Sequence, residues 1–216
     1  MAAQARALIA AAVAAAALAG CGGQDEGISG GGKVIGKTVT VYSLANDPGG
    51  ANQDFVDAEK LALADAGGRA GSLAVNLSSL DLGGGDQKLQ AQAARRAITD
   101  PQIMAAIADA TAVTVPLFNA AGILQVAATG DPALAKDPHA NPSGAETVGA
   151  LPAAPAPRDF ARRFQETFGR APKPSAAAGY RAMEGVLRAI AAAGSGGNDR
   201  TRVIDAYLSS GTSSPG

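Results

Sequence analysis

The residue types that most often carry out catalysis or bind metal are sparse in this chain. It holds one histidine, His139, and one cysteine, Cys21. A zinc site needs several histidine or cysteine ligands, and a Ser/His/Asp triad needs a firmly held histidine, whereas His139 stands in a polar loop with Asp137. We therefore expect no catalytic residues, no metal ligands, no cofactor and no enzyme activity.

One segment fits a nucleotide-binding motif by spacing alone. Residues 31–38, Gly-Gly-Lys-Val-Ile-Gly-Lys-Thr, have the spacing of a P-loop. That motif binds phosphate only when a strand precedes it and a helix follows it. Here glycines precede it and a β-branched, strand-like run follows, so we interpret the match as a coincidence.

The lone cysteine stands at the end of an export signal. Arg6 precedes an unbroken apolar run over 7–18, which is shorter than the ~20 residues that span a bilayer. Leu18-Ala19-Gly20-Cys21 resembles the lipobox of bacterial lipoproteins, which implies cleavage before Cys21 and its acylation; an ordinary signal with a chance cysteine is the alternative. We expect an extracytoplasmic protein that acyl chains on Cys21 anchor to the cell membrane.

The charge balance and length limit the remaining classes. The formal net charge is -1, and it is -2 once Arg6 leaves with the signal, which excludes the basic face that nucleic acid requires. The mature length suits one domain. The expected divisions are a signal peptide (1–20), a flexible Gly-rich tether (21–36), a βαβ sheet (37–129), a Pro-rich linker (130–158), C-terminal helices (159–209) and a frayed tail (210–216).

Strand-like and helix-like segments alternate in the first half. Short β-branched or apolar runs predict strands over 38–43, 73–77, 103–108 and 124–127, and helical spacing of apolar residues predicts helices over 55–66, 87–99 and 112–121. Gly67-Gly68 and Gly122 end two of these helices, and Pro116 either kinks the third or lies in its first turn. The pattern predicts an α/β lobe whose parallel sheet is covered on both faces.

The alternation stops over 128–158, which is either a linker or the remnant of a lost part. Six of the chain's 12 prolines fall there: Pro132, Pro138, Pro142, Pro152, Pro155 and Pro157. Helical patterns then resume with Phe160, Phe164 and Phe168, and a second apolar stripe begins at Met183. Asn198-Asp199 can cap a last helix that carries Val203 and Tyr207.

These segments resemble a known family. Lys60-Leu61-Ala62-Leu63 before Ala66-Gly67-Gly68, residues 115–123 (Val-Pro-Leu-Phe-Asn-Ala-Ala-Gly-Ile), and Phe168-Gly169-Arg170-Ala171-Pro172 with Gly179-Tyr180-Arg181-Ala182-Met183 are similar to type I periplasmic binding proteins. Within that group they resemble branched-chain amino-acid binding lipoproteins of ABC transporters. The resemblance covers 38–129 and 151–208 and implies a two-lobed ancestor, most of whose second lobe the Pro-rich stretch replaces.

The resemblance also implies where a ligand binds. Such proteins hold an amino acid between their lobes, with its carboxylate on hydroxyls and on N–H groups at helix N-termini. The loops 43–50, 109–112 and 128–131 follow predicted strands, where α/β sheets bind ligands. We expect Thr111 and Thr129 to offer hydroxyls and Ala110 a backbone contact, unless both threonines only cap helices. Tyr180 is a further candidate, although its spacing from Met183 favours core packing.

The expected function is therefore a substrate-binding lipoprotein of a branched-chain amino-acid ABC transporter. Its partners would be a small amino acid, bound weakly or no longer bound, and an ABC permease. One lobe leaves a ligand half solvated, while binding still costs translational and rotational freedom. The alternative is a non-transporting interaction module or a decayed gene product, whose exposed cleft face would favour self-association.

Overall fold

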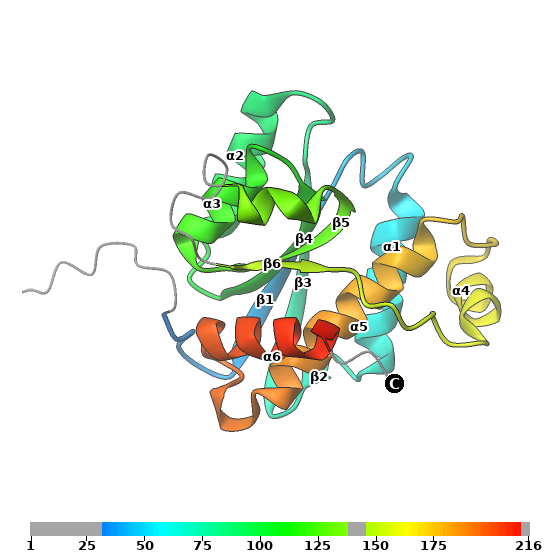
Figure 1. The fold of residues 1–216 in the computed structure, drawn as a ribbon. Helices are drawn as coiled ribbons and strands as arrows, with labels where there is room; N and C mark the ends of the chain where they lie inside the picture. Colours follow the sequence, from blue (N-terminus) through cyan, green and yellow to red (C-terminus); the bar gives the residue numbers. More distant parts are fainter. Residues whose placement is uncertain (1–31, 138–145, 213–216) are drawn as a thin grey trace, which may run out of the picture.

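The structure, a computed structural model, describes residues 32–137 and 146–212. The predicted signal peptide, Cys21 and His139 lie outside these residues. One six-stranded sheet forms the centre, in the order β2-β3-β1-β4-β5-β6 (Figure 1). All neighbouring strands are parallel except β2 and β3. The strands are β1 (Thr38–Ala45), β2 (Arg69–Ala70), β3 (Leu73–Asp81), β4 (Ile103–Ala110), β5 (Leu124–Gly130) and β6 (Val148–Ala150).

Helices connect the parallel strands and cover both faces of the sheet (Figure 1). The α-helices are α1 (Gln53–Asp65), α2 (Gln87–Ile98), α3 (Thr114–Ala121), α4 (Phe160–Phe168), α5 (Ala176–Ala192) and α6 (Arg200–Thr212). Two 3₁₀ turns, η1 (Pro132–Lys136) and η2 (Gly194–Gly196), complete the described chain. The predicted α/β lobe with C-terminal helices packed on its sheet is confirmed.

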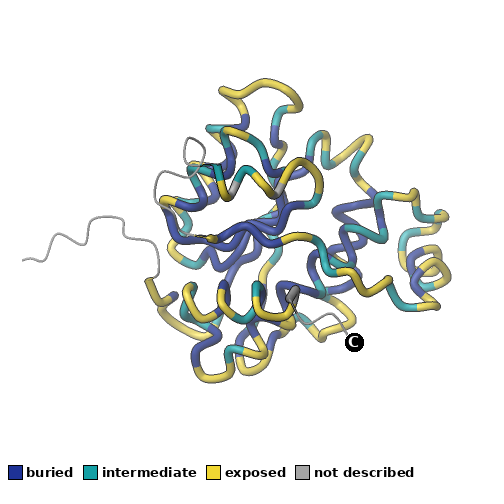
Figure 2. The backbone as a smooth tube through the Cα atoms, viewed as in Figure 1, coloured by how far each residue is buried: buried dark blue, intermediate teal, exposed yellow. Residues whose placement is uncertain are grey.

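Alternate residues of the strands supply the two largest hydrophobic clusters of the described residues. In β4, Ala105 and Ile107 join the core beneath α1, α4, α5 and α6, whereas Ala106 and Ala108 join the core beneath α2 and α3. Successive side chains of a strand point to opposite faces, so a strand buried on both faces is apolar along its whole length. Figure 2 shows the result, with the buried residues concentrated along the strands and on the inner sides of the helices.

The predicted helix ends agree with the structure. Gly67 and Gly68 have positive φ of 65° and 69°, and their N–H groups donate to carbonyls in the last turn of α1. Gly122 ends α3 in the left-handed conformation. Pro116 is the third residue of α3, so its missing N–H falls in the first turn and the helix is not kinked there.

The prediction of a flexible tether up to residue 36 was wrong at its end. The side chain of Val34 is 1% exposed, and its N–H donates to Asn198 O at 2.7 Å. Asn198 Nδ2 in turn donates to Val34 O at 3.0 Å, and Lys33 forms a β-bridge with Asp199. The short segment Lys33-Val34-Ile35 between glycines gave no signal of this docking, which depends on a loop more than 160 residues further along the chain.

The prediction of an unstructured linker over 130–158 was also wrong in part. Residues 132–136 form η1, and β6 extends the sheet parallel to β5. A strand of three residues in a proline-rich segment has no recognisable sequence pattern. Its central residue is Gly149, and a Cβ there would lie 2.3 Å from the ring of Tyr207. The predicted frayed tail likewise begins too early, since α6 continues to Thr212.

Candidate functional site

The carboxyl ends of β1, β4 and β5 converge at one edge of the sheet. A bulge shapes this edge: Ala108 pairs with Ala127 and Ala110 with Gly130, so Ala128 and Thr129 together face Asp109. A bulge of this kind redirects side chains at the end of a ladder. Gly130 is required there, since it has φ of 89° and a Cβ would lie 2.3 Å from the carbonyl oxygen of Ala110.

Asp109, which is half-buried, occupies the centre of this edge. Its Oδ2 accepts a hydrogen bond from Asn46 Nδ2 at 3.0 Å, and its Oδ1 accepts one from the Thr129 hydroxyl. Each of the three residues comes from, or directly follows, a different strand. The three loops that the sequence predicted as a ligand site therefore meet through the Asp109 carboxylate.

Asn46 extends the network to the loop after β3. Its Oδ1 accepts the N–H of Gly84 at 2.8 Å, and Asn52 Nδ2 donates to its backbone oxygen. Next to it, Asp81 at the end of β3 accepts the N–H groups of Asp47 and Gly83 at 3.2 and 2.9 Å. Four successive strand ends of the parallel sheet are thus cross-linked by short polar side chains.

The Thr111 hydroxyl lies at the start of α3. It donates to Gln90 Oε1 at 3.2 Å and accepts the N–H groups of Val113 and Thr114 at 3.2 and 3.1 Å. It therefore satisfies N–H groups that a helix N-terminus otherwise leaves open. This is the capping role that the sequence offered as the alternative to ligand binding.

A buried layer supports the edge from below. Gln125 Nε2 donates to the Asp109 backbone oxygen at 2.9 Å and to Thr114 Oγ1 at 3.0 Å, and Thr114 Oγ1 donates to the same carbonyl at 2.7 Å. Gln125 and Thr114 are fully buried, so the backbone that carries Asp109 is fixed. Ala110, the predicted backbone contact, is 3% exposed and ends β4 opposite Gly130.

Tyr180 lies elsewhere, in the layer formed by α1, α4 and α5. Its ring packs edge-on to Phe160 with centroids 5.3 Å apart, and its hydroxyl donates to Asp65 Oδ2 at 2.7 Å. Burial and the neighbouring Asp65 carboxylate raise the pKa of Tyr180. Asp65 is the last residue of α1, a helix that begins just after the loop holding Asn46 and runs back along the sheet. The structure therefore does not bring Tyr180 together with Thr111 and Thr129.

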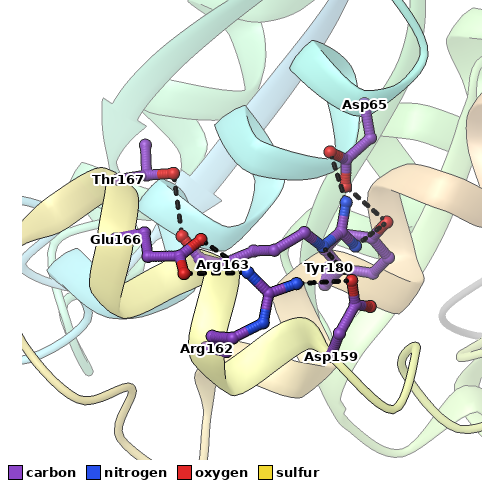
Figure 3. Close-up of polar contacts among 7 residues, drawn as sticks. All are labelled: Asp65, Asp159, Arg162, Arg163, Glu166, Thr167 and Tyr180. Atoms are coloured by element: carbon purple, nitrogen blue, oxygen red, sulfur yellow. Dashed lines mark hydrogen bonds and ion pairs between the residues drawn. The ribbon is translucent and has the colours of Figure 1, made fainter.

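Charged residues around Tyr180 attach α4 to the rest of the lobe (Figure 3). Arg163 Nη1 lies 2.6 Å from Asp65 Oδ1, and its Nη2 donates to the Tyr180 hydroxyl at 3.4 Å. On the outer side of α4, Arg162 pairs with Glu166 at 2.8 Å. The ion pair between Arg163 and Asp65 joins α4 to α1, and the hydrogen bonds of both residues to Tyr180 add α5. We interpret these contacts as structural.

Sequence reasoning did not single out Asn46, Asp109 or Gln90. The first two lie within the loops predicted to bind a ligand, but only the strand register places them on one another. The structure describes no group of three or more histidine, cysteine, aspartate or glutamate side chains placed to hold a metal ion within 32–137 and 146–212. This edge therefore presents hydroxyl, amide and carboxylate groups from three strand ends.

Comparison with known proteins identifies the fold. Neither a family model nor a curated protein sequence matches this chain. Among solved structures it is similar to a leucine-binding protein from Thermotoga maritima, with 14% identity and a TM-score of 0.58 over 78% of this chain and 87% of that chain. A branched-chain amino-acid transporter substrate-binding protein from Streptococcus pneumoniae in complex with isoleucine shares 10% identity, with a TM-score of 0.58 over 79% and 88%.

A third similar structure has a different ligand. It is a solute-binding protein of an ABC transporter from Rhodopseudomonas palustris in complex with 3,4-dihydroxybenzoic acid, with 11% identity and a TM-score of 0.60 over 79% of this chain and 85% of that chain. The described residues thus have the fold of a type I periplasmic binding protein lobe, as the sequence resemblance predicted. Within 32–137 and 146–212 the structure has one sheet and therefore one such lobe. It also contains no helix long and apolar enough to span a bilayer in those segments.

Proposed function

We propose that this chain is an extracytoplasmic substrate-binding lipoprotein of a branched-chain amino-acid type ABC transporter, with weak binding of its ligand. The observation that carries the proposal is the convergence of Asn46, Asp109 and Thr129 at the carboxyl ends of three strands in this fold. Open α/β sheets bind their ligands in the crevice outside those ends. The similar solved structures include transporter proteins with isoleucine or an aromatic acid bound.

We expect weak binding because residues 32–137 and 146–212 form one sheet, and therefore one lobe. A ligand at this edge meets one protein surface and keeps its other side in water, while association still costs about 4–15 kcal/mol of translational and rotational freedom. We expect dissociation constants in the millimolar range, which correspond to about 4 kcal/mol. The remaining partner in transport would be an ABC permease.

Amide NMR of the mature chain, with Cys21→Ser to prevent acylation, tests this function. Leucine, isoleucine and valine should shift the amides of Asn46, Thr111 and Thr129 at millimolar concentration and leave the Asp65 and Tyr180 region unchanged. Binding of one amino acid at micromolar concentration by a monomer would contradict weak binding. Unchanged amides at the edge with all three amino acids would contradict the binding role itself.

The membrane attachment proposed here depends on Cys21. Acyl chains gain about 0.8 kcal/mol for each buried methylene, so two or more chains would hold the protein on the outer face of the membrane. Metabolic labelling with an alkyne fatty acid should label the wild-type chain and not Cys21→Ser, and the variant should leave the membrane fraction. Equal membrane retention of both would contradict lipid anchoring.

The second candidate function is a non-transporting interaction module or a decayed gene product. Two observations favour it. The side-chain donors of Asn46 and Thr129 already have Asp109 as their acceptor. In addition, Leu89 in α2, next to this edge, is 45% exposed. Analytical ultracentrifugation checks for the self-association that this function predicts, and a strictly monomeric chain would count against it.

A further inference from the structure

We infer that the Asp109 carboxylate takes the position of a ligand's carboxylate at this edge, and that this residue makes the site select amines over carboxylates. The inference rests on the proposed ligand site and names the class of ligand that the site accepts. Asp109 would then be the residue that determines specificity. It acts by occupying the hydrogen-bond donors at the edge and by its charge.

The first step is the occupation of the side-chain donors. A carboxylate binds where N–H and O–H groups point at it. At this edge the Thr129 hydroxyl and the Asn46 amide both donate to Asp109, one to each carboxylate oxygen. The two donors come from the ends of the strands on either side of β4 and are arranged around a carboxylate, but the carboxylate belongs to the chain.

The second step is the start of α3, where an anion would otherwise bind. The N–H groups of Val113 and Thr114 donate to the Thr111 hydroxyl, and the N–H of Val115 donates to the Thr111 backbone oxygen. Pro116, the next residue, has no N–H to offer. The hydrogen-bond partners in the described chain thus account for the donors of this first turn.

The third step is the charge of the strand ends. Asp81 is the last residue of β3 and Asp109 is the next-to-last residue of β4, and Asp47 and Asp131 lie in the loops after β1 and β5. Asp47, Asp81 and Asp131 are exposed, and Lys136 in η1 is a basic residue in the loop after β5. Several acidic groups near a half-solvated site repel a second carboxylate and attract an ammonium group. A ligand that brings its own N–H donors meets acceptor oxygens of Asp109 on arrival.

Three probes that share an isobutyl group separate the ligand classes. They are isoamylamine, which carries only the ammonium group, isovalerate, which carries only the carboxylate, and leucine, which carries both. Each is titrated into the ¹⁵N-labelled mature chain with Cys21→Ser, and the amides of Asn46, Thr111 and Thr129 are followed. Wild type should respond to isoamylamine and leucine and not to isovalerate.

Substitution of Asp109 should reverse this preference. Asp109→Ala frees the Thr129 and Asn46 donors, so isovalerate should bind about 10-fold to 100-fold more tightly. This is the range that one charge-assisted hydrogen bond supplies. Asp109→Asn keeps the shape of the side chain and removes its charge, so it should give a smaller gain and guards against loss of folding. Asp131→Ala removes an edge charge without freeing either donor and should leave isovalerate unbound.

Two results would overturn the inference while leaving the proposed function in place. One is isovalerate binding to wild type as tightly as to Asp109→Ala. The other is a folded Asp109→Ala and Asp109→Asn with no gain for isovalerate, while wild type still responds to leucine. Absence of any response at the edge, with every probe and every variant, would instead contradict the proposed binding function together with the inference.

Discussion

Arg170 Nε donates to Asp54 Oδ1 at 2.9 Å and joins residues that are 116 positions apart in the sequence. Arg170 Nη2 also lies 2.7 Å from Asp57 Oδ2, and the N–H of Lys173 donates to Asp54 Oδ2 at 2.8 Å. The Asp54 side chain is 2% exposed. The loop between α4 and α5 is therefore fastened to the first turn of α1, the helix that follows the Asn46 loop.

We predict that Asp54→Ala destabilises the lobe by about 1.5–3 kcal/mol at neutral pH, the contribution of hydrogen bonds to a charged group. Urea unfolding measures this change. Glu166→Ala is the matched control, because Glu166 pairs with Arg162 on the surface with its side chain 59% exposed, and such pairs contribute about 0–1 kcal/mol. Equal effects of the two substitutions would contradict a structural role for the buried contact.

The same contact predicts a dependence on pH. The backbone N–H of Lys173, and then the Arg170 guanidinium, lower the pKa of Asp54 below its usual value of 3.8. A lowered pKa in the folded state adds stability above the unfolded pKa, and this stability is lost as the pH falls through the folded pKa. The difference in unfolding free energy between wild type and Asp54→Ala should therefore shrink below about pH 4. A difference that is constant from pH 7 to pH 3 would count against this.

Glu59 in α1 predicts the opposite dependence on pH. It is fully buried, and neither of its carboxyl oxygens has a hydrogen-bond partner among the described residues. Burial raises the pKa of Glu59 well above its usual value of 4.5. The folded state then keeps a proton that the unfolded chain releases, so stability falls as the pH rises from about 4.5 toward the folded pKa.

Glu59→Gln should remove this loss, because glutamine stays neutral at every pH. We expect the melting temperature of Glu59→Gln to exceed that of wild type at pH 8 and the two to converge at pH 4. The exposed Glu146 gives the control Glu146→Gln, which should follow wild type throughout. A pH profile of Glu59→Gln parallel to that of wild type would show that the folded chain accommodates an ionised Glu59.

The sequence predicted the long elements because their patterns arise locally. Strands β4 and β5 begin with mostly apolar runs, β1 is rich in β-branched residues, and β3 begins with a short apolar run. The helices α1, α2 and α3 have helical spacing of apolar residues and end at recognisable glycines or capping residues. The two-residue β2 and three-residue β6 were missed. Their strand conformation comes from pairing with a neighbour already in the sheet, and no run of so few residues carries a pattern.

The candidate site was predicted to the level of its loops and not of its contacts. Hydroxyl groups after predicted strands pointed to Thr111 and Thr129. The role of Asp109 depends on the extra residue that β5 inserts opposite β4, which turns Thr129 toward the carboxylate. Register between strands is a property of two distant segments, so one segment read alone does not reveal it.

Gly179 tests the close packing of α5 on α1. A Cβ at this position would lie 2.2 Å from the carbonyl oxygen of Phe55, a backbone atom that cannot rotate away. We expect Gly179→Ala to destabilise the lobe by about 1–3 kcal/mol, although alanine is the better helix former. Gly49→Ala is the control, because its Cβ would meet nothing within 4 Å, and it should change stability by less than about 0.5 kcal/mol. Thermal unfolding of both variants measures the difference.

Thr111 and Thr129 should separate into a structural and a binding residue. Thr111→Ala removes the acceptor for two N–H groups at the start of α3 and should cost about 1 kcal/mol of stability, whereas Thr111→Ser should restore it. Thr129 is exposed, so Thr129→Ala should change stability by less than about 0.5 kcal/mol.

Leucine titrations followed by NMR complete the comparison, because they report binding independently of stability. Thr129→Ala alters the hydroxyl that holds Asp109 at the edge and should change the amide shifts at Asn46, while Thr111→Ser should leave the titration as in wild type. A loss of leucine response in Thr111→Ser would assign the methyl group of Thr111 to the site. A stability loss in Thr129→Ala as large as that in Thr111→Ala would instead make the Thr129 to Asp109 contact part of the fold.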